Sequence, residues 1–449
     1  MFPRPLRVGT DFSGIDAVIF ALEFLGVPYE YLFASERDVL ARDFLRKNHK
    51  PQHLYSDVAQ RPSVPGWELD LYGASPPCQS FSQAGPRKGL GDARGRLFFE
   101  AVMFIERSKP KTFFVENSAE LLKSPHAAFL SGVLQRLRDA SYWVQARTLN
   151  AGEHGLPHNR PRTFLVGVRL DCKRRDVVLF APPIAPLSLA TTLSPWKDGD
   201  DTAGLPPLSA PVARAIVQRA KDRAGGIQGD WMVDCGASRA WANCRPRLVC
   251  PCLTRARKHG HWIGSRGRYI ELLEATRMQG ILRAEKLRWP ASEGECFQLL
   301  GNSIAGCVLH RLLPRLLYAA SLGEVQDPWD TGSAQAAFRT WHDKPPARRA
   351  RPTVLDLLRA RRAPQRGGAT QQEDCSRPAW DTGRVQAAFR TMHDEPPVSK
   401  AHPTVLDLLR SSSALQRGEA TPRENCSRPA GMDALKAQRA LLPYVQLLD

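Results

Sequence analysis

A cysteine held in a rigid turn is the residue of this 449-residue chain best suited to covalent chemistry. Cys78 follows Pro76 and Pro77, which fix an extended backbone and keep a helix from starting there. Residues 68–72 have the pattern of a short apolar strand, so we expect the thiol at the carboxyl end of a strand. A thiol presented in this way is a candidate nucleophile, although an arbitrary free cysteine is more often inert and buried.

Three further charged side chains are expected at neighbouring strand ends. Glu116 ends the strand predicted over 112–115, where a carboxyl group could handle a proton on a heterocycle. Arg160 and Arg162 lead into the strand predicted over 163–168 and, being two residues apart, lie on the same side of an extended chain. Two guanidinium groups at a strand mouth can bind a carbonyl oxygen and position a carboxylate.

The first predicted strand and helix are joined by a loop that suits a cofactor. Ser13 and Gly14 allow close backbone approach, and the helix that follows favours a ligand carboxylate at its N-terminus. Glu36 ends the second predicted strand, 22 residues beyond Gly14, a spacing that suits a ribose diol. Asp57 is similarly placed to reach a cofactor base. Either acidic residue could equally be a solvated surface carboxylate.

Glycines interleaved with arginine and lysine follow the candidate nucleophile over residues 85–96. This composition predicts a mobile lid that could close on phosphates. An ordinary solvated loop has the same composition and stays open as the alternative.

Short apolar strands alternate with helical stretches from residue 6 to about 167. This alternation predicts an α/β fold with a doubly wound, mainly parallel sheet. The predicted strands are 6–10, 31–35, 112–115 and 163–168, and the predicted helices are 17–25, 98–107 and 129–140.

Prolines break the pattern over about 170–247, and helical periodicity returns at 269–280 and 303–320. We therefore predict four segments. They are a core at 1–170, a loop-rich insert at 171–247, the remainder of the core at 248–320 and a largely disordered tail at 321–449.

The tail contains a tandem repeat with an offset of 51 residues and no gap. Trp-Asp-Thr-Gly at 329 recurs at 380, and Ala-Ala-Phe-Arg-Thr at 336 recurs at 387. Two copies are too few for a self-supporting solenoid. We interpret them as a duplicated interaction motif for an unidentified protein partner. A recent duplication without function explains them equally well.

A net charge of +18 and a pI near 9.8 indicate a polyanionic partner, most simply nucleic acid. Residues 321–449 carry 19 basic and 15 acidic side chains, so most of the excess belongs to the first 320 residues. No apolar run long enough for a membrane span and no secretory leader are present, and the cysteines are scattered. The sequence predicts an intracellular protein with a monomeric core, nuclear in a eukaryote or cytoplasmic in a prokaryote.

Taken in order, these motifs resemble the cytosine-C5 DNA methyltransferase family. The likeness covers about residues 6–320. It is carried by the loop at 8–15, Pro-Cys-Gln-Ser-Phe-Ser at 77–82, Glu-Asn at 116–117, residues 149–167, Leu-Thr-Arg at 253–255, residues 274–280 and Gly-Asn-Ser-Ile at 301–304.

The resemblance implies a Rossmann-like fold and a reaction on cytosine flipped out of double-stranded DNA, with S-adenosyl-L-methionine as cofactor. It implies that Cys78 adds to C6, that Glu116 contacts N3 and the exocyclic amine, and that Arg162 holds O2. Arg160 would position the neighbouring groups. The residues 171–247 correspond to the family's target-recognition region.

The resemblance also implies a set of cofactor contacts. Phe12, Ser13 and Gly14 would hold the methionine end, Glu36 the ribose and Asp57 the adenine. Asn302 and Ser303 would close the site from the far end of the chain.

The chain departs from the family pattern at the first loop. Asp16 and Ala17 stand where the family has glycines, and Asp11 is out of register with the family's aspartate. His158 replaces a glutamine that is mainly structural in the family, and we expect little effect. Cys235, Cys244, Cys250 and Cys252 lie close together, but their Cys-x-Cys end suits a tetrahedral zinc site poorly, so we predict no metal.

Three functions are compatible with these features. The first is a DNA methyltransferase. The second is a tRNA cytosine-C5 methyltransferase, although the Cys-Phe-Thr signature usual for that type is not visible. The third is a catalytically silent nucleic-acid-binding homologue, which the presence of Cys78, Glu116, Arg160 and Arg162 disfavours.

Overall fold

The computed structural model describes residues 2–342, apart from 63–66, 78–92, 226, 228, 237–245 and 257–259. The chain divides into two compact units, 1–353 and 354–449, and all described residues belong to the first. Cys78, residues 85–92 of the expected lid and the second copy of the repeat lie outside the described residues. None of the helices in the described ranges is long and apolar enough to cross a membrane.

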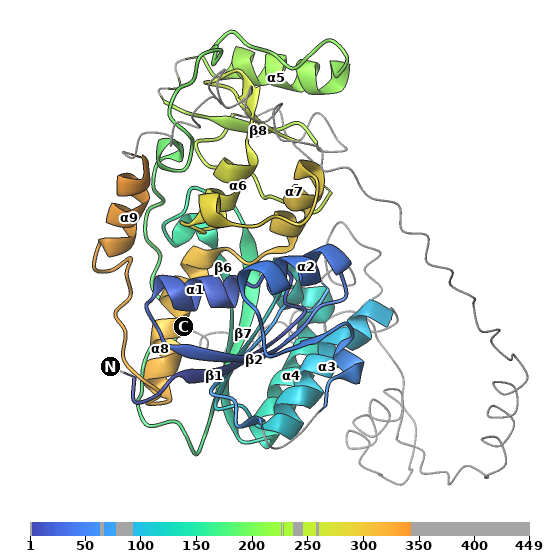
Figure 1. Cartoon of the computed structure of the whole chain (residues 1–449), viewed down its shortest axis with the longest axis vertical. Coiled ribbons are helices and arrows are strands. Elements are labelled where there is room, and N and C mark those ends of the chain that lie inside the picture. Colours follow the sequence, from blue (N-terminus) through green and yellow to red (C-terminus); the bar gives the residue numbers. More distant parts are fainter. Residues whose placement is uncertain are drawn as a thin grey trace, which may run out of the picture. The chain divides into compact units, whose positions relative to one another are not determined.

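A seven-stranded sheet in the order β3-β2-β1-β4-β5-β7-β6 forms the centre of the fold (Figure 1). Neighbouring strands run parallel except around β7, which is antiparallel to both β5 and β6. The predicted doubly wound, mainly parallel α/β sheet is therefore confirmed. The strands are β1 (Leu6–Asp11), β2 (Tyr29–Ser35), β3 (His53–Tyr55), β4 (Leu71–Ala74), β5 (Thr112–Ser118), β6 (Tyr142–Asn150) and β7 (Pro161–Arg169).

Helices cover both faces of the sheet because its strands are apolar on both sides. Phe113 and Phe114, adjacent on β5, point into two different core clusters, as the two-residue period of a strand requires. The cluster with Phe114 includes α1 (Ala17–Phe24) and α8 (Gly306–Ala319). The cluster with Phe113 includes α3 (Ala93–Ser108) and α4 (Ala127–Asp139).

A third cluster joins a helix from the first part of the chain to the later part. It contains Phe44 from α2 (Val39–Asn48), Met278 from α6 (Leu272–Met278) and Leu299 from α7 (Glu293–Asn302). Helix α2 and strand β6 were not predicted from the sequence. Helix α3 begins at Ala93, so residues 93–96, expected in the lid, are its first turn.

The insert extends beyond its predicted end at 247. Strand β8 (Met232–Asp234) pairs with β9 (His261–Ile263), and β9 pairs with β10 (Arg268–Tyr269), in a small antiparallel sheet. The three residues of β8 need these later partners to satisfy their backbone groups. Helix α5 (Pro211–Arg223) packs against this sheet, with Ile216 and Val217 in the same cluster as Val233 (Figure 1).

The predicted start of the disordered tail at 321 also needs correction. Trp329 and Phe338 are 3% and 1% exposed and belong to the core cluster of α1 and α8. The intervening residues form the start of helix α9 (Ser333–His342). A few isolated apolar residues in a polar stretch give no periodic pattern, so the sequence could not show that they are buried.

Acid should destabilise the fold through its buried histidines. Burial lowers the pKa of His310 to about 3, and that of His49 and His154 to about 4. The unfolded chain, with an ordinary histidine pKa, then binds protons first as the pH falls below about 6.5, so stability is lost progressively below that pH. For His310 alone the loss between pH 7 and pH 5 should be roughly 2 kcal/mol.

Chemical denaturation of wild type and His310→Phe at the two pH values would measure this contribution. His310 stacks on Phe24 with ring centroids 4.2 Å apart, so phenylalanine keeps a ring in place. The variant should lose less stability than wild type between pH 7 and pH 5. Equal losses in the two proteins would contradict the assignment.

Candidate active site

A cavity of about 500 Å³ opens at the carboxyl ends of the central strands. It collects most of the predicted site residues from elements far apart in the chain. Those lining it are Phe12, Gly14, Glu36, Asp57, Glu116, Arg160, Arg162 and Asn302. Pro76 and Pro77, which lead to Cys78, also line it.

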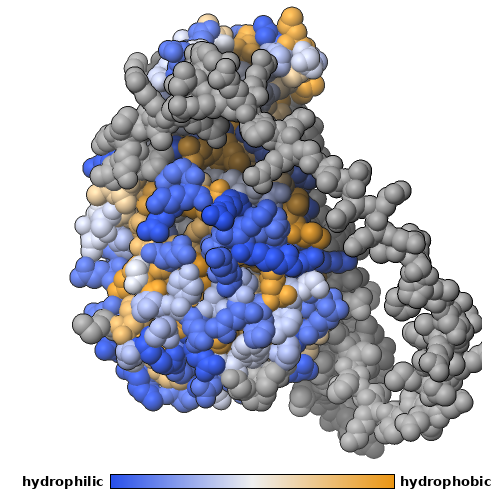
Figure 2. Space-filling view, in the orientation of Figure 1, coloured by the Kyte–Doolittle hydropathy of each residue, from blue (hydrophilic) through white to orange (hydrophobic). Residues whose placement is uncertain are grey.

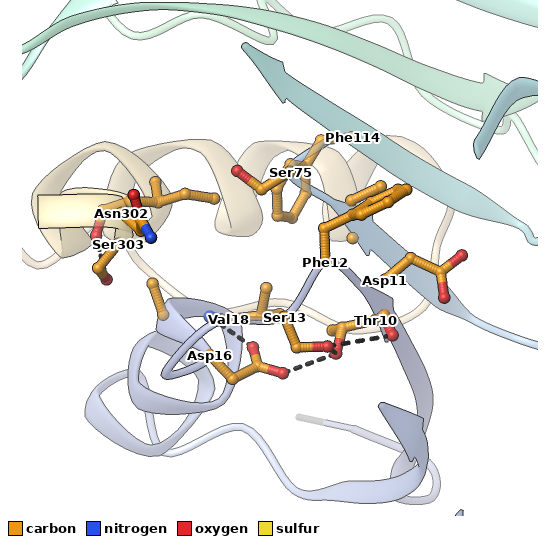
Figure 3. A pocket seen from close by; sticks show the side chains of 14 residues that line it. Thr10, Asp11, Phe12, Ser13, Asp16, Val18, Ser75, Phe114, Asn302 and Ser303 are labelled. Carbon is orange, nitrogen blue, oxygen red and sulfur yellow. Dashed lines mark hydrogen bonds between the residues drawn. The ribbon is translucent and has the colours of Figure 1, made fainter. Parts of the chain in front are cut away.

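A smaller hollow adjoins this cavity and contains the two remaining predicted cofactor residues, Ser13 and Ser303. Figure 3 shows side chains from the β1–α1 turn, from Ser75 and from Asn302 and Ser303 around one space. The β1–α1 turn and the end of α7 thus line the same hollow.

Glu116 is a buried carboxylate held from both sides. The hydroxyl of Ser75 donates to its Oε2, and Nε of Arg162 lies 3.2 Å from its Oε1. The side chain of Arg162 is 20% exposed, so its positive charge borders the cavity. This arrangement presents a carboxyl group and a cation to the same side of a bound heterocycle.

The backbone that leads to Cys78 is anchored at two points before this residue. The Asn117 side chain donates to the Pro76 carbonyl at 3.1 Å, and the backbone N–H of Ser75 donates to the Asp11 carbonyl at 3.2 Å. The asparagine after Glu116 therefore fixes the backbone two residues before the candidate nucleophile.

Arg160, which lines the cavity, also joins segments that are distant in the chain. Its guanidinium donates to the carbonyls of Leu253 at 2.5 Å, Gly301 at 3.0 Å and Ser303 at 2.5 Å. The residue is 2% exposed, and burial together with Arg162 lowers its pKa. These contacts fit the expectation that Arg160 positions neighbouring groups.

Glu36 is fixed by backbone donors at the end of β2. Its Oε2 accepts from the N–H of Gly14 at 2.8 Å, and its Oε1 accepts from the N–H of Asp38 at 2.7 Å. Burial raises its pKa. Each carboxylate oxygen retains accepting capacity, so the side chain fits a ribose diol in the cavity. Asp57 is exposed and accepts from the N–H of Ala59 at 2.9 Å.

Asp16 is a buried residue of this site whose part the sequence did not reveal. It occupies a left-handed conformation with φ 54°, which explains how the chain accommodates the loss of a glycine. Its Oδ1 caps α1 by accepting from the N–H of Val18, and its Oδ2 accepts from the Thr10 hydroxyl (Figure 3). The same Oδ2 also accepts from the Tyr31 hydroxyl. The cap signal of an aspartate before an apolar helix could have identified it.

Asp11 and His158, where the sequence departs from the family pattern, are both held by hydrogen bonds to other parts of the fold. The Asp11 carboxylate is bound by the Arg61 guanidinium and by the Tyr72 hydroxyl at 2.6 Å. His158 is fully buried, with Nδ1 3.1 Å from the Met278 carbonyl, while its Nε2 accepts from the N–H of Leu253. Both residues hold elements together around the cavity.

The described cysteines of the candidate zinc cluster are Cys235, Cys250 and Cys252, whereas Cys244 lies outside the described residues. Within the part of the chain that the structure describes, no group of three or more histidine, cysteine or acidic side chains could hold a metal ion. The Cys252 sulfur lies 3.6 Å from Nη1 of Arg160 and 3.9 Å from Nη2 of Arg162.

A mainly parallel sheet, a tight turn after β1 and an acidic residue after β2 are typical of Rossmann-like proteins that bind a nucleoside-type cofactor. Comparison with known proteins makes the class specific. Residues 9–196 match the family model of the C-5 cytosine-specific DNA methylases. This part of the chain is therefore similar to the cytosine-C5 methyltransferases, and members of that family use S-adenosyl-L-methionine as methyl donor.

Individual relatives agree with this assignment. The type II methyltransferase M.NlaX of Neisseria lactamica is 28% identical over 326 residues, covering 70% of this chain and 97% of its own length. The orphan methyltransferase M.SPRI of Bacillus phage SPR is 35% identical over 185 residues, but the match covers only 42% of its length. The crystal structure of S. pombe Dnmt2 shares the fold, with a TM-score of 0.52 and 18% identity over 70% of this chain and 99% of that one.

Proposed function

We propose that this enzyme is a DNA (cytosine-5-)-methyltransferase that acts on a cytosine flipped out of double-stranded DNA. The observation that carries the proposal is the Glu116 carboxylate, held between Ser75 and Arg162 on the wall of a cavity that Pro76 and Pro77 also line. A cytosine base that enters this cavity would meet the Glu116 carboxylate, the Arg162 guanidinium and the prolines that lead to Cys78. The net charge of +18 suits a polyanionic substrate. The face shown in Figure 2 carries hydrophilic residues interspersed with apolar ones.

In this proposal the Cys78 thiolate forms a bond to C6 of the cytosine, which makes C5 a carbon nucleophile. Glu116 contacts N3 and the exocyclic amine and offsets the charge that develops on the ring, while Arg162 holds the O2 carbonyl. Bound S-adenosyl-L-methionine supplies the electrophilic methyl group. A base, for which a water is sufficient, then takes the C5 proton, and the bond between sulfur and C6 breaks to regenerate the thiolate.

The cofactor contacts are proposed at the adjoining end of the cavity. Phe12, Ser13 and Gly14 hold the methionine end, and Glu36 binds the ribose diol. Asp57 contacts the adenine. Asn302 and Ser303 close the site at the end of α7.

Glu36→Ala should weaken cofactor binding by about 10- to 100-fold, because one good hydrogen-bonded charge contact contributes roughly 1.5–3 kcal/mol. Calorimetric titration with S-adenosylhomocysteine measures this without turnover. Glu30→Gln is the matched control, since Glu30 is an exposed residue of the same strand β2. Equal affinity of Glu36→Ala and the control would refute the ribose contact.

The substrate is tested with labelled S-adenosyl-L-methionine and separate double-stranded DNA and tRNA. We expect methyl transfer to C5 of cytosine in DNA, because the matching family model describes DNA methylases. Transfer to tRNA alone would replace DNA with the runner-up substrate. Transfer to neither, with Cys78→Ala indistinguishable from wild type, would favour a silent nucleic-acid-binding homologue.

A further inference from the structure

The proposed function leaves the 51-residue repeat unexplained. The described part of its first copy, residues 329–342, packs into the core of the fold. The contacts of this segment show which of the repeated residues make it bind.

The Trp329 indole fills a socket floored by a glycine. It is 3% exposed, and a Cβ atom added at Gly155 would lie 2.2 Å from Cε3 of the indole. Phe338, nine residues further on and in α9, packs beside it with ring centroids 5.7 Å apart. The two aromatic side chains therefore form the apolar part of the contact.

The aspartate of the motif binds two arginines of α8. Oδ1 of Asp330 lies 2.9 Å from Nη2 of Arg311, and Oδ2 lies 2.9 Å from Nη2 of Arg315. The Arg311 side chain is 1% exposed and is held in place by the Pro182 carbonyl and by His154. The Arg311 side chain is thus held in place by residues of the core, and Asp330 of the motif binds to it.

Two more residues shape the segment itself. Gly332 adopts φ +79°, which favours glycine, at the start of α9. The Gln335 side chain donates to the Trp329 carbonyl at 2.9 Å and closes the turn.

The second copy has the same residue at each of these positions: Trp380, Asp381, Gly383, Gln386 and Phe389. Its substitutions predict weaker binding. Val385 stands where the fully buried Ala334 is, and Pro378 stands in place of Asp327, which also binds Arg311 and Arg315.

We propose that the socket formed by Gly155, Arg311 and Arg315 is a peptide-binding site that recognises this motif. The first copy fills it in the structure, and the sequence of residues 380–393 is a second, weaker ligand for it. Binding needs the indole, the aspartate and the glycine turn together, so unrelated apolar peptides do not bind.

The test uses the full chain carrying Trp329→Ala and Trp380→Ala, which empties the socket and removes the competing second copy. A fluorescently labelled peptide with the sequence 380–393 is added, and fluorescence anisotropy is recorded. We expect saturable binding to the double variant and at least tenfold weaker binding to wild type. The same peptide with Trp380→Ala should not bind.

Equal binding to both proteins, or binding to neither folded protein, would overturn the proposal. Circular dichroism checks that the double variant is folded. Should it fail to fold, Asp330→Asn in the full chain weakens only the first copy's ion pairs. The peptide should then raise the melting temperature of Asp330→Asn more than that of wild type, and the absence of such a difference would equally overturn the proposal.

Discussion

Cys78→Ala is expected to reduce methyl transfer by at least about 10³-fold, because removal of a nucleophile leaves only binding and electrostatic effects. The reduction should appear in kcat, while the affinity for S-adenosylhomocysteine stays within about threefold of wild type. Single-turnover assays with labelled cofactor, combined with calorimetric titration, separate the two quantities.

Cys252→Ala is the matched control for this experiment. Its sulfur lies near both arginines of the site, so it is the described thiol most easily confused with a nucleophile. The control should retain activity within about threefold of wild type. If Cys252→Ala loses activity and Cys78→Ala does not, the proposed nucleophile is wrong.

A cytosine with fluorine at C5 tests the covalent bond itself. After methyl transfer its C5 carries no proton, so the enzyme cannot eliminate and the adduct through sulfur persists. Wild type and Cys252→Ala should form a denaturation-resistant complex with such DNA, visible as a shifted band on a gel. Cys78→Ala should form none.

Arg160→Met should lower the free energy of unfolding by about 3–5 kcal/mol. The substitution leaves the carbonyls of Leu253, Gly301 and Ser303 without their donor, and each buried polar group left unpaired costs about 1–3 kcal/mol. Chemical denaturation monitored by circular dichroism measures the loss. Arg160→Lys should recover only part of it, since a lysine cannot donate in the directions of a planar guanidinium.

Arg162→Met is the informative comparison because it removes the same functional group two residues away. Arg162 is 20% exposed, whereas the 2% exposed Arg160 donates to three carbonyls, so the loss of Arg162 should lower the free energy of unfolding less than the loss of Arg160. It should nevertheless reduce kcat, because its charge borders the cavity beside Glu116. Similar stability losses in the two variants would show that the division of labour between the arginines is wrong.

The sequence predicted the fold class because the alternation of strands and helices depends on local chemistry. Pro76 and Pro77 restrict the backbone whatever surrounds them, and alternating strands and helices require a layered sheet. Glu36 and Glu116 follow predicted strands, and the carboxyl ends of neighbouring parallel strands meet at one edge. Arg162 lies at the start of β7 instead, and because β7 is antiparallel to β5, its start lies at that same edge. These residues could therefore be assigned to one site before any contact was known.

The partners of these residues were decided only by the tertiary structure. No pattern in the neighbouring sequence shows that Arg160 binds carbonyls 93 to 143 residues away, or that Asp16 accepts a hydrogen bond from the Tyr31 hydroxyl. The same reason explains the two misplaced boundaries. Trp329 is buried because Gly155 leaves space for its ring, and β8 exists because β9 pairs with it. The sequence alone determined which groups could do the chemistry, whereas long-range packing decided what holds each of them in place.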